Sequence, residues 1–140
     1  QISVAELFTD LKKLFPEEEF QFEAPSPELK LNADRTQIEQ VLINLLKNAR
    51  EACNRKLDKN IQVKVKKLST GNTALTISDN GEGILPDVLD KIFVPFFTTK
   101  TSGSGIGLSL CKQIMTLHEG SINVKSEVGK GSSFILTFPK

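Results

Sequence analysis

Residues 61–78 read IQVKVKKLSTGNTALTIS, and this stretch decides the fold class. In its first half Ile61, Val63 and Val65 alternate with polar side chains, which is the period of a strand with one buried face. The turn residues TGN then lead into a second strand-like run, so the two halves are predicted to pair as an antiparallel hairpin. Such a hairpin needs no crossover helix between its strands, which argues against a fold built from repeated βαβ units.

The segments on either side of this hairpin complete an α+β pattern. A helical or strand-like spacing of apolar residues marks seven further segments: helices at 4–15, 34–55 and 105–118, and strands at 20–22, 29–31, 122–124 and 134–138. Asp34 is placed to cap the longest helix and Gly120 to end the last one, while Gly129 and Gly131 predict the final turn. We therefore expect an α+β fold, a two-layer α/β sandwich in which helices cover one face of a mixed, mostly antiparallel sheet.

The composition is that of one globular domain spanning residues 1–140. Acids and bases are spread along the chain and sum to a formal charge of +1, so no basic stripe suggests nucleic acid as the main partner. Because there is no long apolar run and no signal-peptide pattern, we expect no direct membrane contact. Cys53 and Cys111 match no metal-ligand spacing, which predicts reduced thiols in a cytoplasmic protein.

Two asparagines lie on one face of the longest predicted helix. Asn44 and Asn48 are four residues apart, and asparagine is a poor helix former unless its amide finds a partner. A ligand is one such partner, because the amide oxygen suits Mg²⁺ held by few protein groups and by nucleotide phosphates. The alternative is a pair of solvated or helix-bonded amides.

Asp79 ends a predicted strand and is followed by Gly81 and Gly83, which let the backbone turn sharply and approach a flat ligand. A carboxylate only accepts hydrogen bonds, so it can receive the exocyclic amine of adenine but not the carbonyl oxygen of guanine. This favours ATP over GTP. An ordinary turn is the alternative, whereas calcium is rejected because the two glycines fall where an EF-hand loop needs oxygen ligands.

The stretch FFTTKTSGSGIGLSL at 96–110 has glycines at 103, 105 and 107 before a helical pattern. It is neither a Walker loop nor the dinucleotide fingerprint, because Leu108 replaces the third glycine and no strand precedes it. A glycine-rich entry to a helix offers backbone N–H groups to phosphate, and it also suggests a lid. Three side chains just before it are candidates for the same anion: Thr98, Thr99 and Lys100. A loose surface loop is the alternative.

Five motifs in this order resemble the N, G1, F, G2 and G3 boxes of sensor histidine kinases. They are IEQVLINLLKNAREA (38–52), DNGEGI (79–84), IFVPFFTTK (92–100), GSGIGLSL (103–110) and GKGSSFILTFP (129–139). The resemblance covers about three quarters of the chain. It implies the catalytic and ATP-binding domain of that family, with the Bergerat fold shared with the ATPase domains of gyrase, Hsp90 and MutL, and with ATP and Mg²⁺ as ligands.

The resemblance also implies roles for individual residues. Asn48 would coordinate Mg²⁺, Asn44 would lie near the phosphates, and Asp79 would bind the adenine amine, with Lys100 on phosphate. Further positions would contact or enclose the nucleotide: Gly81, Gly83 and Ile84 at the adenine, Phe93 and Phe97 as lid anchors, Gly103, Ser104, Gly105, Ile106, Gly107 and Leu108 in the lid, and Ser132 at a water beside Asp79. Where many members have a basic and an aromatic residue this chain has Glu51 and Ala52, so we expect Arg50 or Arg55 to supply the basic contact.

The reaction implied is transfer of the γ-phosphate to a histidine on a separate helical dimerisation domain, with a response regulator downstream. Related ATPases carry a glutamate where this chain has Asn44, and an amide cannot act as a general base, so we expect ATP to be held without efficient hydrolysis. His118 is expected to be structural. The domain would lie in the cytoplasm, with anchoring of its parent in the inner membrane left open. An anti-sigma-type serine kinase and an ATP-dependent conformational switch remain as alternatives.

Overall fold

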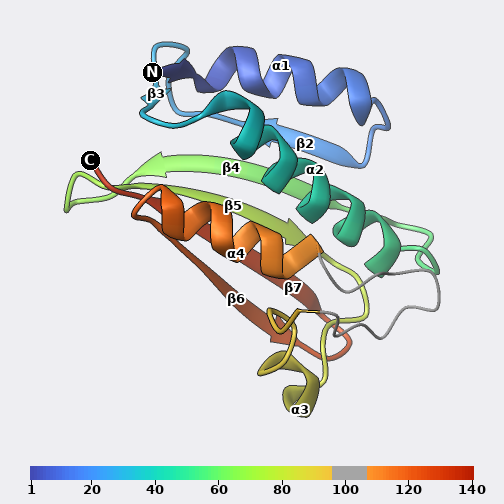
Figure 1. Cartoon of the computed structure of the whole chain (residues 1–140). Coiled ribbons are helices and arrows are strands. Elements are labelled where there is room, and N and C mark those ends of the chain that lie inside the picture. The colour runs from blue at the N-terminus through green and yellow to red at the C-terminus, as the bar shows by residue number, and fades with distance from the viewer. Residues whose placement is uncertain (96–106) are drawn as a thin grey trace.

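The computed structural model describes residues 1–95 and 107–140 of the chain (Figure 1). Helices alternate with pairs of strands along the chain, as predicted. The elements are β1 (Ile2–Ser3), α1 (Val4–Leu14), β2 (Phe20–Glu23), β3 (Lys30–Leu31), α2 (Arg35–Ala52), β4 (Ile61–Lys67), β5 (Thr73–Asp79), α3 (Pro86–Leu89), α4 (Gly107–Leu117), β6 (Ser121–Glu127) and β7 (Gly131–Phe138).

The main sheet has five strands in the order β2-β4-β5-β7-β6. Only β2 and β4 are parallel, and the other neighbours are antiparallel, so the mixed and mostly antiparallel sheet predicted from the hairpins is confirmed. The β4–β5 hairpin pairs Ile61 with Asp79, which places the carboxylate at one end of the sheet. A separate two-stranded sheet joins β1 and β3.

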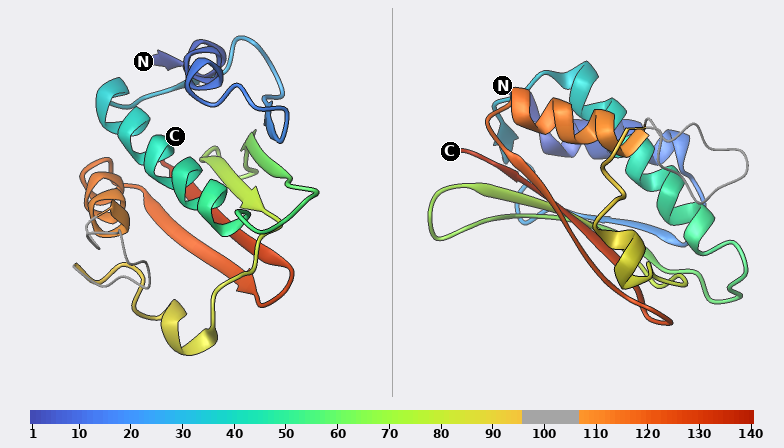
Figure 2. Two further views of the ribbon diagram at one scale, coloured as in Figure 1. Left: turned by 90° about the vertical axis from the view of Figure 1, so that its right-hand side faces the viewer. Right: turned by 60° about the horizontal axis from the view of Figure 1, so that its bottom comes forward.

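The helices α1, α2 and α4 lie on the same face of the main sheet, as the turned views show (Figure 2). The central helix α2 contacts β5, β7 and both other long helices. Its apolar stripe is buried as predicted, with Ile38, Leu42 and Leu46 showing no exposed surface. Burying each such side chain contributes roughly 1.5–3 kcal/mol, so α2 is fixed mainly by packing. No helix in the described ranges is long and apolar enough to cross a membrane.

The termini of the long helices differ in part from the prediction. Asp34 caps α2 by accepting from the Gln37 N–H at 3.0 Å, as expected. The helix ends at Ala52 rather than Arg55, because Cys53 is the C-cap residue and its backbone N–H binds back to Ala49. Leu14 lies on the apolar spacing that predicts the helix at 4–15, but it is 58% exposed at the end of α1.

The end of α4 is a Schellman motif with an unexpected residue in the left-handed position. Glu119 has a φ of 59°, and the N–H groups of Glu119 and Gly120 bind the carbonyls of Thr116 and Met115. The left-handed position is thus one residue earlier than the predicted Gly120. That glycine is needed for another reason, because a Cβ there would lie 2.3 Å from the backbone oxygen of Thr137 on β7. The glycine therefore lets the chain pass directly from helix to sheet.

His118 ties this end of α4 to the beginning of α2. Its Nε2 accepts from the Asp34 N–H at 3.0 Å, and its Nδ1 lies 2.8 Å from the Ile114 carbonyl, to which it donates in the neutral tautomer. Both ring nitrogens are thus engaged by backbone, which fits the expected structural role.

Candidate functional site

Three element ends gather on the helix-covered side of the sheet. The C-terminal end of α2, the N-terminal end of α4 and the last residue of β5 lie near one another at the same end of the molecule (Figure 1). The glycine turn after β5 closes directly on α2, because the Glu82 N–H donates to the Ala52 carbonyl at 3.3 Å. This junction brings the turn after Asp79 to the last residue of α2, in the half of the helix that carries Asn44 and Asn48.

Asp79 is a half-buried carboxylate held by backbone donors. Its Oδ1 accepts from the Gly81 N–H at 2.9 Å, and the Ser132 N–H on the neighbouring strand also donates to it. Burial raises the pKa of Asp79 above the ordinary aspartate range, and the two backbone bonds oppose that rise because they favour the charged form. The result is an oriented acceptor at the edge of the sheet.

The glycines after Asp79 are required by close backbone contacts. A Cβ on Gly81 would lie 2.4 Å from the Ala52 carbonyl oxygen, so any side chain would push the turn off α2. Gly83 has a φ of 79°, and a Cβ there would lie 2.4 Å from the Glu127 carbonyl oxygen. These contacts pack the turn between α2 and the β6–β7 hairpin.

Asn80 fixes the same turn, and the sequence analysis gave it no role. Its Oδ1 accepts from the Asn60 N–H at 2.9 Å, and its Nδ2 donates to the Asp58 carbonyl at 2.8 Å. The buried Cys53 thiol lies 3.5 Å from the same Oδ1. An asparagine next to a strand-ending aspartate was the available signal, because such side chains commonly bind nearby backbone.

Ser132 lies opposite Asp79 in the register of β5 and β7 and is 6% exposed. Its hydroxyl is 2.9 Å from that of Ser126, its register partner on β6. Ser126 in turn accepts from the Ile84 N–H at 2.8 Å, so the predicted Ile84 and Ser132 are linked through a residue that the sequence analysis missed. The alternation of β6 placed Ser126 on the helix-covered face, but the cross-strand register was needed to find its partners.

Asn44 and Asn48 are both half-buried on α2. The Asn44 Nδ2 lies 3.9 Å from the Cys111 sulfur on α4, and a Cβ on Gly107 would be 3.8 Å from the Asn44 amide carbon. The first turn of α4 therefore passes beside Asn44, which joins two of the predicted segments. Burial raises the pKa of Cys111 to about 11, so its thiol stays protonated at neutral pH.

Comparison with known proteins decides the family. The sequence model of the family described as histidine kinase-, DNA gyrase B- and HSP90-like ATPases matches residues 33–140. The chain belongs to this ATPase family. The matched range runs from α2 to the end of the chain and contains every residue of the site described above.

Individual relatives place the chain with the histidine kinases of that ATPase family. Sensor histidine kinase ZraS of Salmonella typhimurium is 42% identical over 110 residues, covering 79% of this chain but 23% of the relative. The solved catalytic domain of histidine kinase ThkA is 36% identical with a TM-score of 0.86, covering 99% of this chain and 93% of that one. ThkA crystallised with the response regulator protein TrrA is 34% identical with a TM-score of 0.80, covering 99% and 41%. The chain is thus a histidine-kinase-type ATPase domain and spans about a quarter of ZraS.

Part of the predicted site in this ATPase domain lies outside the described residues: Phe97, Thr98, Thr99, Lys100, Gly103, Ser104, Gly105 and Ile106. Of the remainder, Leu108 packs half-buried against the core. Glu51 is exposed on the last turn of α2.

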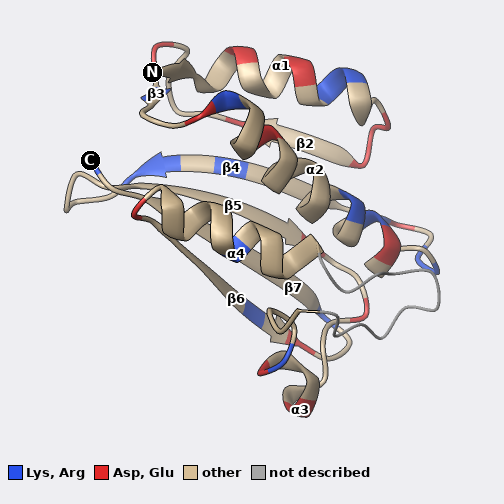
Figure 3. Cartoon of the chain, viewed as in Figure 1, with Lys and Arg blue, Asp and Glu red and all other residues tan. Residues whose placement is uncertain are grey.

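Lys and Arg positions, with acidic positions between them, lie along the C-terminal end of α2 and the loop after it (Figure 3). One of them, Arg50, points to the α1 side, where it pairs with Glu17 at 3.4 Å and lies 4.8 Å from the centre of the Phe15 ring. These contacts hold Arg50 away from the Asp79 junction. Of the two arginines expected to replace the missing basic contact, they favour Arg55.

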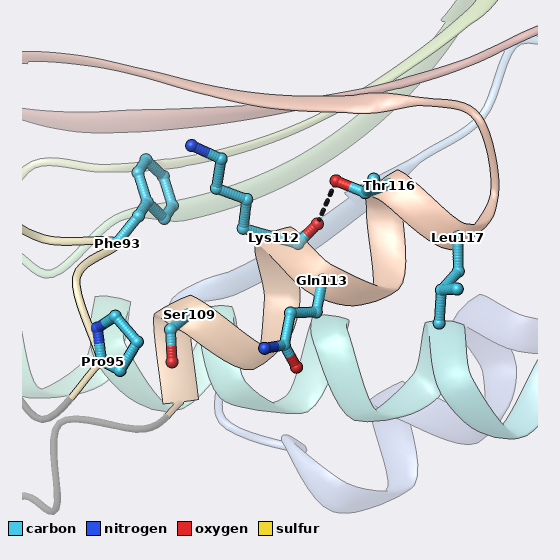
Figure 4. A pocket seen from close by; sticks show the side chains of 7 residues that line it. All are labelled: Phe93, Pro95, Ser109, Lys112, Gln113, Thr116 and Leu117. Carbon is cyan, nitrogen blue, oxygen red and sulfur yellow. Dashed lines mark hydrogen bonds between the residues drawn. The ribbon is translucent and has the colours of Figure 1, made fainter.

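Phe93 packs against β7 and α4. Its ring meets Phe134 edge-on at 6.5 Å, and the Lys112 ammonium lies 5.8 Å from its centre. Beyond it a groove of about 550 Å³ runs between Pro95 and the outer side of α4, where Ser109 and Lys112 are among the lining residues (Figure 4). None of the residues that line this groove belongs to the Asp79 junction.

The side chains of the site could bind Mg²⁺ only together with ligands from a nucleotide and water. Within residues 1–95 and 107–140 no three His, Cys, Asp or Glu side chains gather closely enough to hold a metal. An amide oxygen on α2 is a hard, neutral ligand, and Mg²⁺ is commonly bound by one or two protein groups together with phosphates and water. The residues present are therefore compatible with a metal that arrives with a nucleotide.

Proposed function

We propose that residues 1–140 form one catalytic and ATP-binding domain of a sensor histidine kinase, which transfers the γ-phosphate of Mg·ATP to a histidine on a separate helical dimerisation domain. The observation that carries the proposal is Asn44. It sits one turn before Asn48 beside the first turn of α4, where a family member that hydrolyses ATP would need a carboxylate base. An amide there can orient a phosphate or a water but cannot remove a proton.

The adenine would bind at the Asp79 junction. The carboxylate is acceptor-only and is oriented by the N–H groups of Gly81 and Ser132, which matches the amine of adenine. Gly81 and Gly83 let the turn after Asp79 pack directly on the backbone of Ala52 and Glu127, which would hold the carboxylate in place for the base. Ile84 supplies apolar surface beside this turn.

The phosphates would lie between α2 and the start of α4, with Asn48 as the protein ligand of Mg²⁺. When bound, the metal would neutralise charge on the transferring phosphoryl group. Asn44 would orient a phosphate oxygen through its amide. Gly107 has no side chain, which leaves room for that phosphate beside the first turn of α4. Lys100 and the glycine-rich segment before α4 would complete the phosphate site and exclude water. Alignment with the acceptor nitrogen would then supply much of the rate.

The partners follow from this reaction. The acceptor histidine would come from the helical dimerisation domain, because His118 has both ring nitrogens bound to backbone. A response regulator would receive the phosphate next, and the crystallised pair of ThkA and TrrA supports that kind of partner. We propose a cytoplasmic location for this domain, with a parent that senses a signal elsewhere in its length.

The test is transfer from γ-labelled ATP to the dimerisation domain of the parent kinase, supplied as a separate protein. We expect acid-labile, alkali-stable label on that domain, which is the behaviour of phosphohistidine. Asn48→Ala should abolish the Mg²⁺-dependent transfer, and Lys64→Ala, an exposed lysine on the far face of the sheet, should leave it unchanged. Label that stays on ATP with a folded acceptor present, or transfer retained by Asn48→Ala, would reject the assignment.

A further inference from the structure

The turn after β5 requires an asparagine at position 80. The Asn80 Oδ1 accepts from the Asn60 N–H at 2.9 Å, and its Nδ2 donates to the Asp58 carbonyl at 2.8 Å. Both partners are backbone groups with fixed roles, so the orientation of the side-chain amide is determined. An aspartate could not take this place, because a carboxylate has no proton for the Asp58 carbonyl.

The next residue must be glycine. A Cβ on Gly81 would lie 2.4 Å from the Ala52 carbonyl oxygen, which leaves no space for a side chain. The structure therefore requires an asparagine followed directly by a glycine at this turn. The sequence contains this pair only once, at Asn80 and Gly81.

An Asn-Gly pair is chemically labile. The backbone nitrogen after an asparagine can lose its proton and attack the carbon of the side-chain amide. The new C–N bond closes a five-membered succinimide ring, while the amide nitrogen takes up a proton and leaves as ammonia. Water then opens the ring to an aspartate or an isoaspartate. Glycine permits this reaction best, because it has no Cβ to hinder the attack and its backbone rotates freely.

The closed turn opposes ring closure. The ring draws the amide carbon of Asn80 toward the Gly81 nitrogen, so the bonds to Asn60 and Asp58 must break first. The Gly81 N–H is itself bound to the Asp79 Oδ1 at 2.9 Å, which fixes the attacking nitrogen. Asn80 is also half-buried and Gly81 is buried. The reaction is thus limited to the molecules in which the turn is open.

We propose that Asn80 is a site of spontaneous deamidation, which the closed turn suppresses and whose product disables the Asp79 junction. The product has a carboxylate in place of the amide, so the Asp58 carbonyl loses its donor and a second negative charge is added beside Asp79 in the chain. An isoaspartate also adds a carbon to the backbone, which displaces Gly81 from Ala52. The loss of ATP binding that this predicts rests on the proposed function, whereas the modification and its suppression do not.

The experiment is ageing of the full chain in mildly alkaline buffer, once folded and once in urea, with deamidation of each asparagine followed by peptide mass spectrometry. We expect Asn80 to react in urea, and to react more slowly in the folded chain by roughly tenfold or more, because opening of the turn must precede the reaction. Asn72, in the turn between β4 and β5, is the internal control, since the branched Thr73 follows it. Equal rates in folded and unfolded chain, or no reaction at Asn80 in urea, would overturn the inference.

The effect of the product is tested separately with Asn80→Asp. We expect this variant to unfold at a lower urea concentration than wild type, and its dissociation constant for ATP to rise about tenfold, the effect of one hydrogen bond lost from the turn. Asn123→Asp is the matched control, because it adds the same charge at an exposed position on β6 and should behave as wild type. Wild-type stability and wild-type affinity in Asn80→Asp would reject the claim that the product disables the junction.

A further arm separates this inference from the proposed function. Saturating ATP should slow the ageing of the folded chain, because a base bound at Asp79 keeps the turn closed. An unchanged rate with the site occupied would mean that the base lies away from this turn. That result would reject the proposed place of the adenine, while slower deamidation in the folded chain than in urea would still support the modification site.

Discussion

The Ser132 backbone N–H on β7 donates to the carboxylate of Asp79, its register partner on β5. Together with the Gly81 N–H at 2.9 Å this bond fixes the direction of the carboxylate before any ligand arrives. Partial burial raises the pKa of Asp79, so the charged carboxylate destabilises the folded protein. The same carboxylate is an oriented group for ligand recognition.

Replacing Asp79 by Asn should weaken ATP binding. The amide keeps an oxygen for the Gly81 and Ser132 donors but loses the charge that accepts the adenine amine, and a hydrogen bond to a charged group is worth about 1.5–3 kcal/mol. We expect the dissociation constant of ATP to rise by roughly tenfold to a hundredfold in calorimetric titration. Unaltered affinity in a folded variant would place the base elsewhere.

In the absence of nucleotide, Asp79→Asn should have a higher free energy of unfolding than the wild type. This difference should grow as the pH rises. The folded-state pKa of Asp79 is raised, so the folded protein binds this proton more tightly than the unfolded chain does. Its contribution to stability is therefore present at low pH and is lost as the pH rises through the raised pKa. Urea unfolding of wild type and Asp79→Asn should agree best near pH 4 and diverge toward pH 7, roughly across the range above the ordinary aspartate pKa. A variant less stable than wild type at pH 7 would contradict this.

Gly81→Ala should disrupt both stability and nucleotide binding, because its Cβ would meet the Ala52 carbonyl oxygen at 2.4 Å. The turn must then move off α2 and carry Asp79 with it. Gly129→Ala is the control, since Gly129 has a φ of 84° but no atom within 4 Å of the place a Cβ would take, so it costs only the backbone strain of about 1 kcal/mol. Thermal unfolding and ATP titration should show a larger loss for Gly81→Ala, and equal losses would mean that the contact with α2 is unimportant.

Neither cysteine should react with iodoacetamide in the folded protein at pH 8. Cys53 and Cys111 are both fully buried, and burial raises the pKa of each thiol, to about 11 for Cys111. The thiolate is the reactive form, so both burial and protonation protect them. Intact mass should show no adduct without denaturant and two with it. Rapid labelling of the folded chain would indicate that α2 and α4 open.

The sequence predicted those elements whose signal lies within a single segment of the chain. The alternation at Ile61 and Val63, the cap at Asp34 and the stripe of α2 each contain their own signal, and the structure has them in place. The position of Asp79 at the end of a strand was predicted in the same way, from the strand pattern before it and the glycines after it. The ends of the long helices were less predictable, because tertiary contacts decided them.

What could not be predicted depends on contacts between distant segments. The sequence suggests that Gly120 is a left-handed residue at the end of a helix. In the structure a glycine is required there because the backbone of Thr137 on the last strand passes close to it. The roles of Asn80 and Ser126 follow from the loop at 58–60 and from the register of three strands, neither of which has a local pattern. Short elements such as β1 and α3 were missed because two to four residues carry no periodicity.

The most direct test of the central claim is the fate of the γ-phosphate when this chain alone is incubated with saturating labelled Mg·ATP. A competition assay with a fluorescent ATP analogue establishes that the site is filled. With Asn44 in place of a carboxylate, we predict occupied sites, almost no free phosphate and almost no label on the protein, because the acceptor is on another domain. Rapid release of free phosphate would mean that a water is activated despite Asn44, and the domain would then be a hydrolysing ATPase rather than a histidine kinase module.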